Sequence, residues 1–203
     1  MESKVKIYQA PSGNDVTENP ETWHKRRHKS LKNSPAMMFG LYARIGVPDS
    51  VLDLGCGIGV IVHLSAKLGI PSFGFEIMLK EEEHFGLGHL FPADLSKPLP
   101  IFLDPFDLVT CLEVVEHIPP SGADQVVNTM VSHTKNRLVL SAATKGQGGS
   151  GHVNEQPHEY WIDKIQPRLK YSEKESDIVR EIWEATKIVP GYYCRNVMIF
   201  KRK

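Results

Sequence analysis

The chain has 203 residues, with 24 basic and 24 acidic side chains and a net charge of zero at pH 7. This length is enough to bury the core of one domain with a small appendage. The balanced charge provides no overall field that would draw the chain to nucleic acid or to a membrane. Three widely separated cysteines indicate reduced thiols and not a disulfide framework. Because no leader-like N-terminus and no apolar segment of transmembrane length is visible, we expect a soluble cytoplasmic protein.

The first 47 residues are predicted to form an N-terminal arm and helices that act as a lid or cap. Residues 1–20 lack periodicity, apart from a short strand expected at residues 4–8. The basic run His24–Lys29 fits either a solvated helical face or a helix that faces an anionic substrate. Residues 34–46 have apolar positions at helical spacing, which predicts a core helix.

From residue 48 to residue 203 the chain alternates between strand and helix patterns, which we interpret as the main domain. The predicted strands occupy residues 50–55, 71–77, 90–95, 106–114, 136–144 and 196–203. The predicted helices occupy residues 60–69, 121–134, 158–165 and 172–187. Such alternation indicates an α/β fold that is doubly wound, with a mainly parallel sheet and helices on both faces. The polar, glycine-rich residues 145–157 are predicted to form a long loop that touches the substrate as a lid.

Residues 51–60, VLDLGCGIGV, contain three glycines at alternate positions between a strand and a helix. Glycines let a ligand approach the main chain, and the N–H groups at the start of the following helix face it. The dinucleotide-binding motif G-x-G-x-x-G requires a third glycine where this chain has Val60. Asp53 would also repel a pyrophosphate, whereas it suits a ligand that carries an ammonium group. These features disfavour NAD.

The same residues resemble the first motif of class I S-adenosylmethionine-dependent methyltransferases. The resemblance continues in order through FGFE, ADL and FDLVTCLEVVEHIPP, and it covers about residues 48–145. It implies a seven-stranded sheet whose last strand is antiparallel to the rest. It also implies S-adenosylmethionine as the methyl donor and S-adenosylhomocysteine as the product.

The resemblance assigns cofactor contacts residue by residue. Family members use an acid at the position of Glu76 to hold both ribose hydroxyls, and a carboxylate can accept both hydrogen bonds. Residues at the positions of Asp94 and Leu95 contact adenine in the family, and the fourth motif lies beside the methionine part. The residues expected to bind the cofactor are Asp53, Gly55, Cys56, Gly57, Gly59, Glu76, Asp94, Leu95, Leu112 and Glu113.

The candidate catalytic residues are His117, His152 and Glu116. Methyl transfer from a sulfonium requires an in-line arrangement and, for a hydroxyl acceptor, a base. We expect this base just after the fourth strand or on the loop after the fifth. His117 is the first candidate because the ordinary pKa of histidine lies near neutral pH, and His152 is the second. The alternative role for His117 is to shape the substrate site.

A metal is considered at the same place and is not favoured. Glu113, Glu116 and His117 resemble a Mg²⁺-binding segment of two methyltransferase groups, which act on the 2′-hydroxyl of small-RNA 3′ ends and on a catechol-like quinone precursor. His152 would supply a further ligand. The same pattern is frequent in metal-free relatives, so our expectation is a site without metal.

The function expected from these motifs is O-methylation of a small molecule or a sugar-like acceptor. One alternative is a Mg²⁺-dependent RNA 2′-O-methyltransferase, which the basic run His24–Lys29 favours. The neutral charge and the lack of a recognisable RNA-binding module oppose it. The other alternative is a non-catalytic cofactor-binding protein of the same fold. The sequence leaves the acceptor, the methylated atom and the oligomeric state open.

Overall fold

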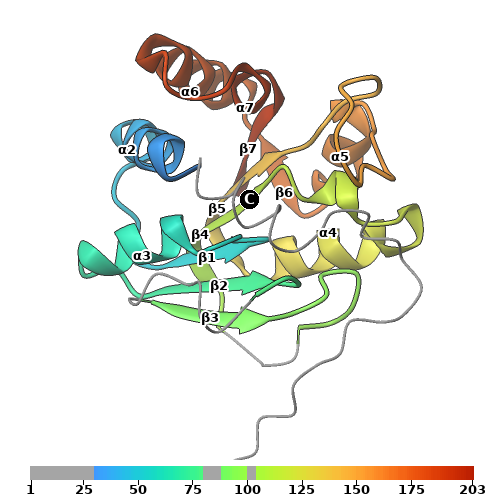
Figure 1. The fold of residues 1–203 in the computed structure, drawn as a ribbon, viewed down its shortest axis with the longest axis horizontal. Coiled ribbons are helices and arrows are strands. Elements are labelled where there is room, and N and C mark those ends of the chain that lie inside the picture. Colours follow the sequence, from blue (N-terminus) through green and yellow to red (C-terminus); the bar gives the residue numbers. More distant parts are fainter. Residues whose placement is uncertain (1–29, 80–87, 100–103) are drawn as a thin grey trace, which may run out of the picture.

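The computed structural model describes residues 30–79, 88–99 and 104–203, and the described part of the chain is built around one seven-stranded sheet (Figure 1). The strand order is β3-β2-β1-β4-β5-β7-β6. β7 pairs antiparallel with β5 and with β6, whereas the other neighbouring strands pair in parallel. The strands are β1 Val51–Leu54, β2 Ser72–Glu76, β3 His89–Pro92, β4 Phe106–Leu112, β5 Thr134–Ser141, β6 Leu169–Tyr171 and β7 Val197–Arg202.

Helices cover both faces of the sheet. The helices are α2 Asn33–Ile45, α3 Val60–Lys67, α4 Ala123–Ser132, α5 His158–Ile165, α6 Glu173–Thr186 and α7 Gly191–Asn196, with short 3-10 turns η1 Ser30–Lys32, η2 Val115–His117 and η3 Pro120–Gly122. α2, α3, α6 and α7 lie on one face, and α4 and α5 lie on the other (Figure 1). In the described part of the chain, no helix is both long and apolar enough to cross a membrane.

Side chains of the central strands alternate between two apolar cores, one for each face of the sheet. In β1, Leu52 and Leu54 enter the core under α4 and α5, while Val51 enters the core under α2 and α6. In β5, Leu140 and Val139 divide between the same two cores. All of these side chains are fully buried. Strands that are apolar at consecutive positions are therefore what a sheet covered on both faces requires, which confirms the doubly wound α/β fold.

The predicted helices at residues 34–46, 60–69, 121–134, 158–165 and 172–187 and all six predicted strands from residue 50 onward are confirmed to within a few residues at their ends. The antiparallel last strand is confirmed as well. The sequence did not reveal β6 or α7. β6 has three residues and only Leu169 is buried, so no alternation is visible, and α7 starts with a glycine and spans less than two turns. The expectations for residues 4–8 and for His24–Lys29 lie outside the described residues.

α2 is fastened over the sheet by α6. The indole N–H of Trp183 donates a hydrogen bond to the Met37 carbonyl at 2.9 Å, and Trp183 is almost completely buried. Gly40 provides the space for this packing, since a methyl group there would lie 2.9 Å from Ile182 Cγ2 and 3.0 Å from Trp183 Cδ1. The position of α2 matters because its first turn reaches the ligand pocket described below.

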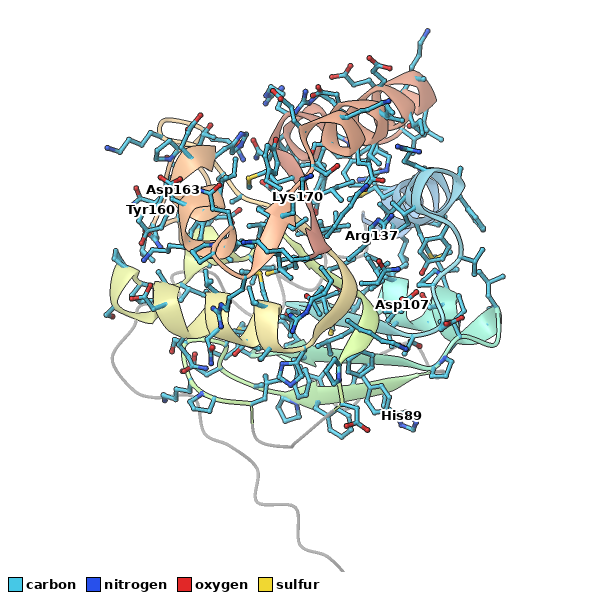
Figure 2. All side chains as sticks on the ribbon, turned by 180° about the vertical axis from the view of Figure 1, so that it is seen from behind. His89, Asp107, Arg137, Tyr160, Asp163 and Lys170 are labelled. Carbon is cyan, nitrogen blue, oxygen red and sulfur yellow. The ribbon has the colours of Figure 1, made fainter. Side chains whose placement is uncertain are left out.

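A buried carboxylate links α6 to three other elements. Glu175 is 4% exposed and accepts Lys201 Nζ from β7 at 2.7 Å and Arg137 Nε from β5 at 3.3 Å (Figure 2 labels Arg137). Arg44 of α2 lies 3.6 Å away. Burial alone would raise the pKa of Glu175, but the hydrogen bond from Lys201 and the charges of Arg137 and Lys201 outweigh it and hold the pKa below its ordinary value.

Replacement of Glu175 by Gln should reduce the loss of folding stability that occurs as the pH falls into the acid range. A carboxyl with a lowered pKa stabilises the fold above the pKa of unfolded Glu, about 4.3, and this contribution is lost as the pH falls through the lower folded value. At pH 7 we expect Glu175→Gln to lower the free energy of unfolding by about 1–3 kcal/mol, measured by urea unfolding. The difference from the unmodified protein should shrink below about pH 4. Glu173→Gln, on the exposed face of the same helix, is the control, and a pH-independent difference would contradict this account.

Candidate functional site

The turn between β1 and α3 requires glycine for two reasons. Gly55, Gly57 and Gly59 have φ values of +75°, +58° and +79°, a left-handed conformation that residues with side chains rarely adopt. A Cβ at Gly55 would overlap Val114, and a Cβ at Gly59 would overlap Leu90. The main chain of this turn is therefore left-handed, and its close packing against Val114 and Leu90 excludes a side chain at Gly55 and at Gly59.

Two buried acids lie at the carboxyl ends of the strands beside this turn. Glu76 ends β2 and is 6% exposed, and its carboxylate accepts hydrogen bonds from the N–H groups of Gly57 at 2.9 Å and Met78 at 3.1 Å. Asp53 in β1 is 4% exposed and accepts the hydroxyl of Thr110 at 2.7 Å. The Glu76 contact joins the glycine turn to the neighbouring strand and leaves further lone pairs on the carboxylate for a ligand.

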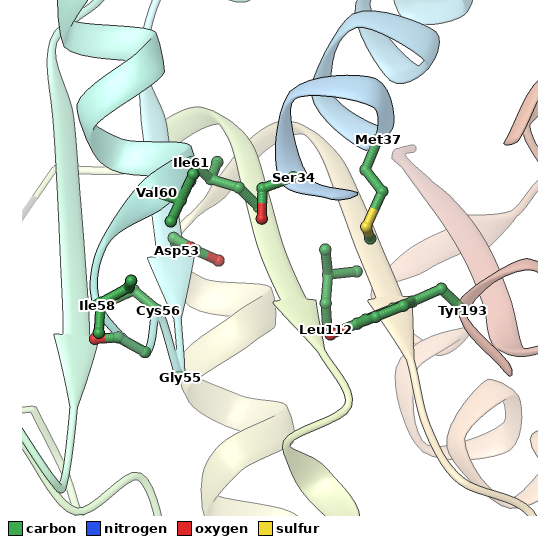
Figure 3. Close-up of a pocket in the computed structure, with 11 residues that line it drawn as sticks. Ser34, Met37, Asp53, Gly55, Cys56, Ile58, Val60, Ile61, Leu112 and Tyr193 are labelled. Atoms are coloured by element: carbon green, nitrogen blue, oxygen red, sulfur yellow. The ribbon is translucent and has the colours of Figure 1, made fainter. Parts of the chain in front are cut away.

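A pocket opens between the glycine turn, α2, the end of β4 and α7 (Figure 3). It is lined by Ser34, Met37, Asp53, Gly55, Cys56, Gly57, Ile58, Val60, Ile61, Leu112 and Tyr193. Five predicted cofactor residues are in this lining, namely Asp53, Gly55, Cys56, Gly57 and Leu112. The sequence analysis did not identify Ser34, Met37 or Tyr193, because nothing local distinguishes them from ordinary helical positions.

Two of the predicted cofactor residues follow β3 and do not line this pocket. Burial would raise the pKa of Asp94, but hydrogen bonds from the Ser96 hydroxyl and N–H and the charge of Lys97 lower it overall. Asp94 is therefore ionised at neutral pH and can accept further hydrogen bonds. The side chain of Leu95 is 6% exposed and belongs to the apolar core, so any polar contact with a ligand comes from its main chain.

Glu113 faces two amide side chains and is not part of the histidine group described next. It is a non-glycine residue with a φ of +54°, and its N–H donates to the carbonyl and hydroxyl oxygens of Ser141. Asn196 Nδ2 donates to Glu113 Oε1 at 3.0 Å and to Gln147 Oε1 at 2.8 Å. Gln147 Nε2 donates in turn to Glu113 Oε2 at 3.0 Å. This closed network ties the loop after β5 to the end of β4 and to α7.

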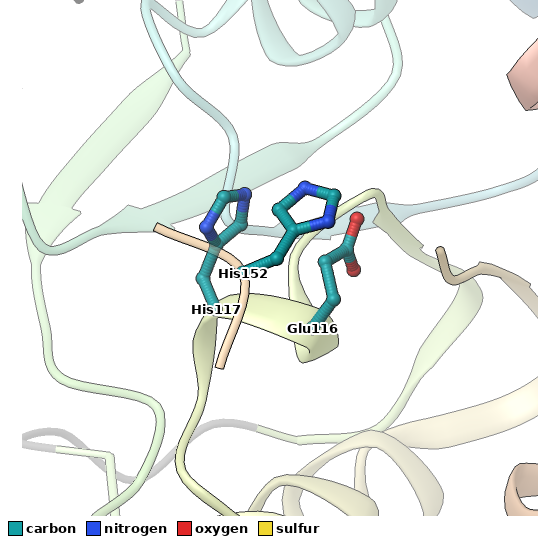
Figure 4. A group of neighbouring side chains, drawn as sticks. All are labelled: Glu116, His117 and His152. Carbon is teal, nitrogen blue, oxygen red and sulfur yellow. The ribbon is translucent and has the colours of Figure 1, made fainter. Parts of the chain in front are cut away.

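Glu116, His117 and His152 form one group (Figure 4). One ligating atom from each residue lies within 4.8 Å of the others. Glu116 is fully buried and His117 is exposed, and both are in η2 directly after β4. The rings of His117 and His152 meet edge to face with centroids 4.9 Å apart. The structure thus brings together all three predicted catalytic residues.

The loop predicted at residues 145–157 is folded against η2. The N–H groups of Val153 and Asn154 both donate to the Glu116 carbonyl, at 2.9 and 3.0 Å. His117 Nδ1 lies 3.1 Å from the Gly151 carbonyl, and because a carbonyl only accepts, this nitrogen carries the proton. The two histidines therefore keep their relative position through main-chain contacts.

The donor set of this group does not fit magnesium. Mg²⁺ prefers oxygen ligands in octahedral geometry, whereas two of the three donors here are imidazole nitrogens. Glu113, which was considered as a further oxygen ligand, is held by Asn196 and Gln147. Zn²⁺ accepts two imidazoles and a carboxylate, which are the donors that these three residues offer.

Cys111, next to this group in β4, is not a nucleophile. Its side chain is fully buried. This burial, followed by the charges of Glu116 and Asp53, raises the pKa of the thiol well above its ordinary value. A protonated, enclosed thiol does not take part in covalent catalysis.

Comparison with known sequences identifies a family and relatives that align with the chain over part of their length. Residues 22–145 match the family model described as a methyltransferase domain. A magnesium-protoporphyrin O-methyltransferase from Synechocystis is 29% identical over 106 residues, which cover 48% of this chain and 46% of the relative. A magnesium protoporphyrin IX methyltransferase from Arabidopsis thaliana is 30% identical over 124 residues, which cover 58% of this chain and 39% of the relative. The chain therefore spans less than half the length of these two relatives.

Comparison with solved structures supports the same fold. A sugar N-methyltransferase from Streptoalloteichus superposes with a TM-score of 0.66 and covers 100% of this chain and 98% of that chain. The two sequences are 14% identical. At this identity the likeness shows the architecture and leaves the acceptor open.

Loss of the Glu113 carboxylate should loosen the loop at residues 145–157. Glu113→Ala removes two charge-assisted hydrogen bonds, each worth about 1.5–3 kcal/mol. We expect exchange of the Gly146, Gly148 and Val153 amide hydrogens to become roughly 10- to 100-fold faster by hydrogen–deuterium exchange. Glu159→Ala, an exposed change on α5, should leave the exchange as it is. Unchanged protection in Glu113→Ala would show that the network does not hold the loop.

Proposed function

The chain belongs to the class I S-adenosylmethionine-dependent methyltransferases, and from this membership we propose that it methylates an oxygen atom of a small molecule or a sugar-like acceptor. The observation that carries the proposal is the pocket between the glycine turn, α2 and the end of β4. Support for the acceptor class comes from the relatives that are named as a magnesium-protoporphyrin O-methyltransferase and a magnesium protoporphyrin IX methyltransferase.

The residues around the pocket fit S-adenosylmethionine. The glycines of the turn allow close approach of the methionine part, and Asp53 and Leu112 line the same space. Glu76 would accept hydrogen bonds from the ribose hydroxyls, and Asp94 one from the adenine amine. When bound, S-adenosylmethionine supplies a methyl group on a sulfonium, whose C–S bond breaks as the acceptor oxygen forms a C–O bond, leaving S-adenosylhomocysteine.

The residues after β4 provide the acceptor side of the proposed reaction. Leu112 lines the donor pocket, and His117 follows it after one short turn. His117 has its proton on Nδ1, so Nε2 is the nitrogen that can take the proton of an acceptor hydroxyl. Glu116 lies beside it and would stabilise the resulting imidazolium charge. In this proposal α2, with Ser34 and Met37, belongs to the cap predicted from the sequence for residues 1–47, of which residues 1–29 lie outside the described part of the chain.

Glu76→Ala should weaken binding of S-adenosylhomocysteine at least about 30-fold, measured by calorimetry. The loss corresponds to about 2 kcal/mol, as expected for hydrogen bonds to a charged group. Because Glu76 also accepts the Gly57 N–H, a ligand that lacks both the 2′- and the 3′-hydroxyl separates the two roles. The variant and the unmodified protein should bind this ligand with similar, low affinity. Equal affinity of both proteins for S-adenosylhomocysteine would contradict the assignment of Glu76.

His117→Gln should lower methyl transfer to a hydroxyl acceptor by about 100-fold or more while binding of S-adenosylhomocysteine stays within about twofold. The assay follows labelled methyl groups into a panel of porphyrin carboxylates, catechols, hydroxylated sugars and RNA 3′ ends. His89→Gln, an exposed change on the edge strand β3, is the matched control (Figure 2). A base mechanism predicts that a chelator has no effect on the rate.

The same assay separates the alternative functions. Inhibition by a chelator that Zn²⁺ or Mn²⁺ reverses would favour a metal site at His117 and His152 over a base. Methylation of RNA ends alone would favour the RNA enzyme. Tight cofactor binding without transfer to any acceptor would favour the non-catalytic alternative.

A further inference from the structure

We propose that Glu155 is a positioning residue of the acceptor site, which holds His152 with its proton on Nδ1 and so makes Nε2 the proton-accepting atom beside His117. The proposal rests on the proposed methyl transfer and adds a residue that the motifs do not assign. Glu155 lies in the loop of residues 145–157 and its side chain is 18% exposed. His152 is three residues earlier in the same loop, and its side chain is 12% exposed.

The carboxylate of Glu155 receives three hydrogen bonds from its own loop. Its Oε1 accepts from the Gly148 N–H and from His152 Nδ1, both at 2.8 Å, and its Oε2 accepts from the Gly146 N–H at 2.8 Å. The hydrogen bond with His152, followed by the one from Gly146, lowers the pKa of Glu155. Glu155 is therefore a carboxylate at neutral pH and acts only as an acceptor.

An acceptor at this place selects one tautomer of His152. Since Glu155 cannot donate, the hydrogen of the bond between them belongs to His152 Nδ1. Nε2 of a neutral His152 is then unprotonated. The same reasoning applies to His117, whose Nδ1 faces the Gly151 carbonyl. Both imidazoles thus carry their proton on Nδ1, and in the neutral form both have a lone pair on Nε2.

The main chain of Gly149 lies against the His152 ring on the side of Nε2. A methyl group at position 149 would overlap the His152 ring, and the atom that it would meet first is Nε2. The loop therefore supplies an acceptor for Nδ1 and omits a side chain next to Nε2. The edge-to-face contact with His117 completes the orientation of the ring. These contacts together favour a ring held for proton transfer over one that only fills space.

The substitution Glu155→Gln distinguishes a purely structural role of Glu155 from the proposed positioning role. The single Gln oxygen can take the place of Oε1 and keep the bond from Gly148, or take the place of Oε2 and keep the bond from Gly146, so a structural role keeps one of these two bonds. A Gln amide, however, can accept from Nδ1–H or donate to an unprotonated Nδ1, and it therefore tolerates both tautomers of His152. The tautomer of His152 in the Glu155→Gln variant therefore distinguishes the positioning role from the structural role.

The test is the protonation of His152 in the full chain labelled with ¹⁵N-histidine, at a pH at which the ring is neutral. Long-range ¹H–¹⁵N spectra report which nitrogen carries the hydrogen, and His152→Gln identifies the signals. We expect the Nδ1–H form in the unmodified protein and in the matched control Glu159→Gln. We expect a mixture of both tautomers in Glu155→Gln. An Nε2–H form in the unmodified protein, or an unchanged Glu155→Gln spectrum, would overturn the proposal.

A second variant tests the position of the His152 ring while Glu155 is kept. Gly149→Ala keeps Glu155 and displaces the ring, so His152 should keep the Nδ1–H form while the ring signals of His117 shift. Unchanged His117 signals would also count against the proposal, because the loop would then not set the contact between the two rings.

Turnover provides the catalytic readout. With any acceptor that the methylation panel identifies, Glu155→Gln should lower kcat about tenfold and leave the KM for S-adenosylmethionine within about twofold. Unchanged kcat would show that the tautomer has no catalytic use. If no acceptor is methylated by the unmodified protein, the proposed function fails, whereas the spectra still decide whether Glu155 positions His152.

Discussion

The hydrogen bond from the Gly57 N–H to the Glu76 carboxylate is the contact on which the donor side of the site depends. It joins the left-handed turn after β1 to the end of β2, so the two strands present one surface. Val114 and Leu90 pack behind the turn and prevent any side chain at Gly55 or Gly59. The result is a glycine-rich turn with a buried carboxylate at its edge, which suits a ligand that carries hydroxyl and ammonium groups.

The proposed acceptor side is assembled differently, from a long loop that carboxylates and carbonyls hold in place. Glu113 binds Gln147 and Asn196, the Glu116 carbonyl accepts two loop N–H groups, and Glu155 closes the loop on itself. Polar networks of this kind specify one arrangement because every broken bond leaves a group without a partner. A loop held in this way can place His152 beside His117 without a regular element to carry it.

The elements that could be predicted are those whose own residues form a recognisable pattern. β1 and β4 are apolar runs, and the alternate glycines follow a strand, so both the fold and the donor motif could be predicted before the structure was known. β6 and α7 are too short to show a period. The pocket wall at Tyr193, the left-handed Glu113 and the role of Glu155 depend on contacts between segments far apart in sequence or on loop geometry, which residue patterns do not encode.

The central claim is that the glycine turn and Glu76 form the site of the methyl donor. Titration of the ¹⁵N-labelled full chain with S-adenosylhomocysteine tests this claim most directly, because the Gly57 amide reports on the hydrogen bond to Glu76. The account predicts saturable shifts of the Gly57 amide signal and of signals in the turn around it, with the same dissociation constant for each. A ligand that binds while Gly57 is unaffected, or no binding at all, would contradict it.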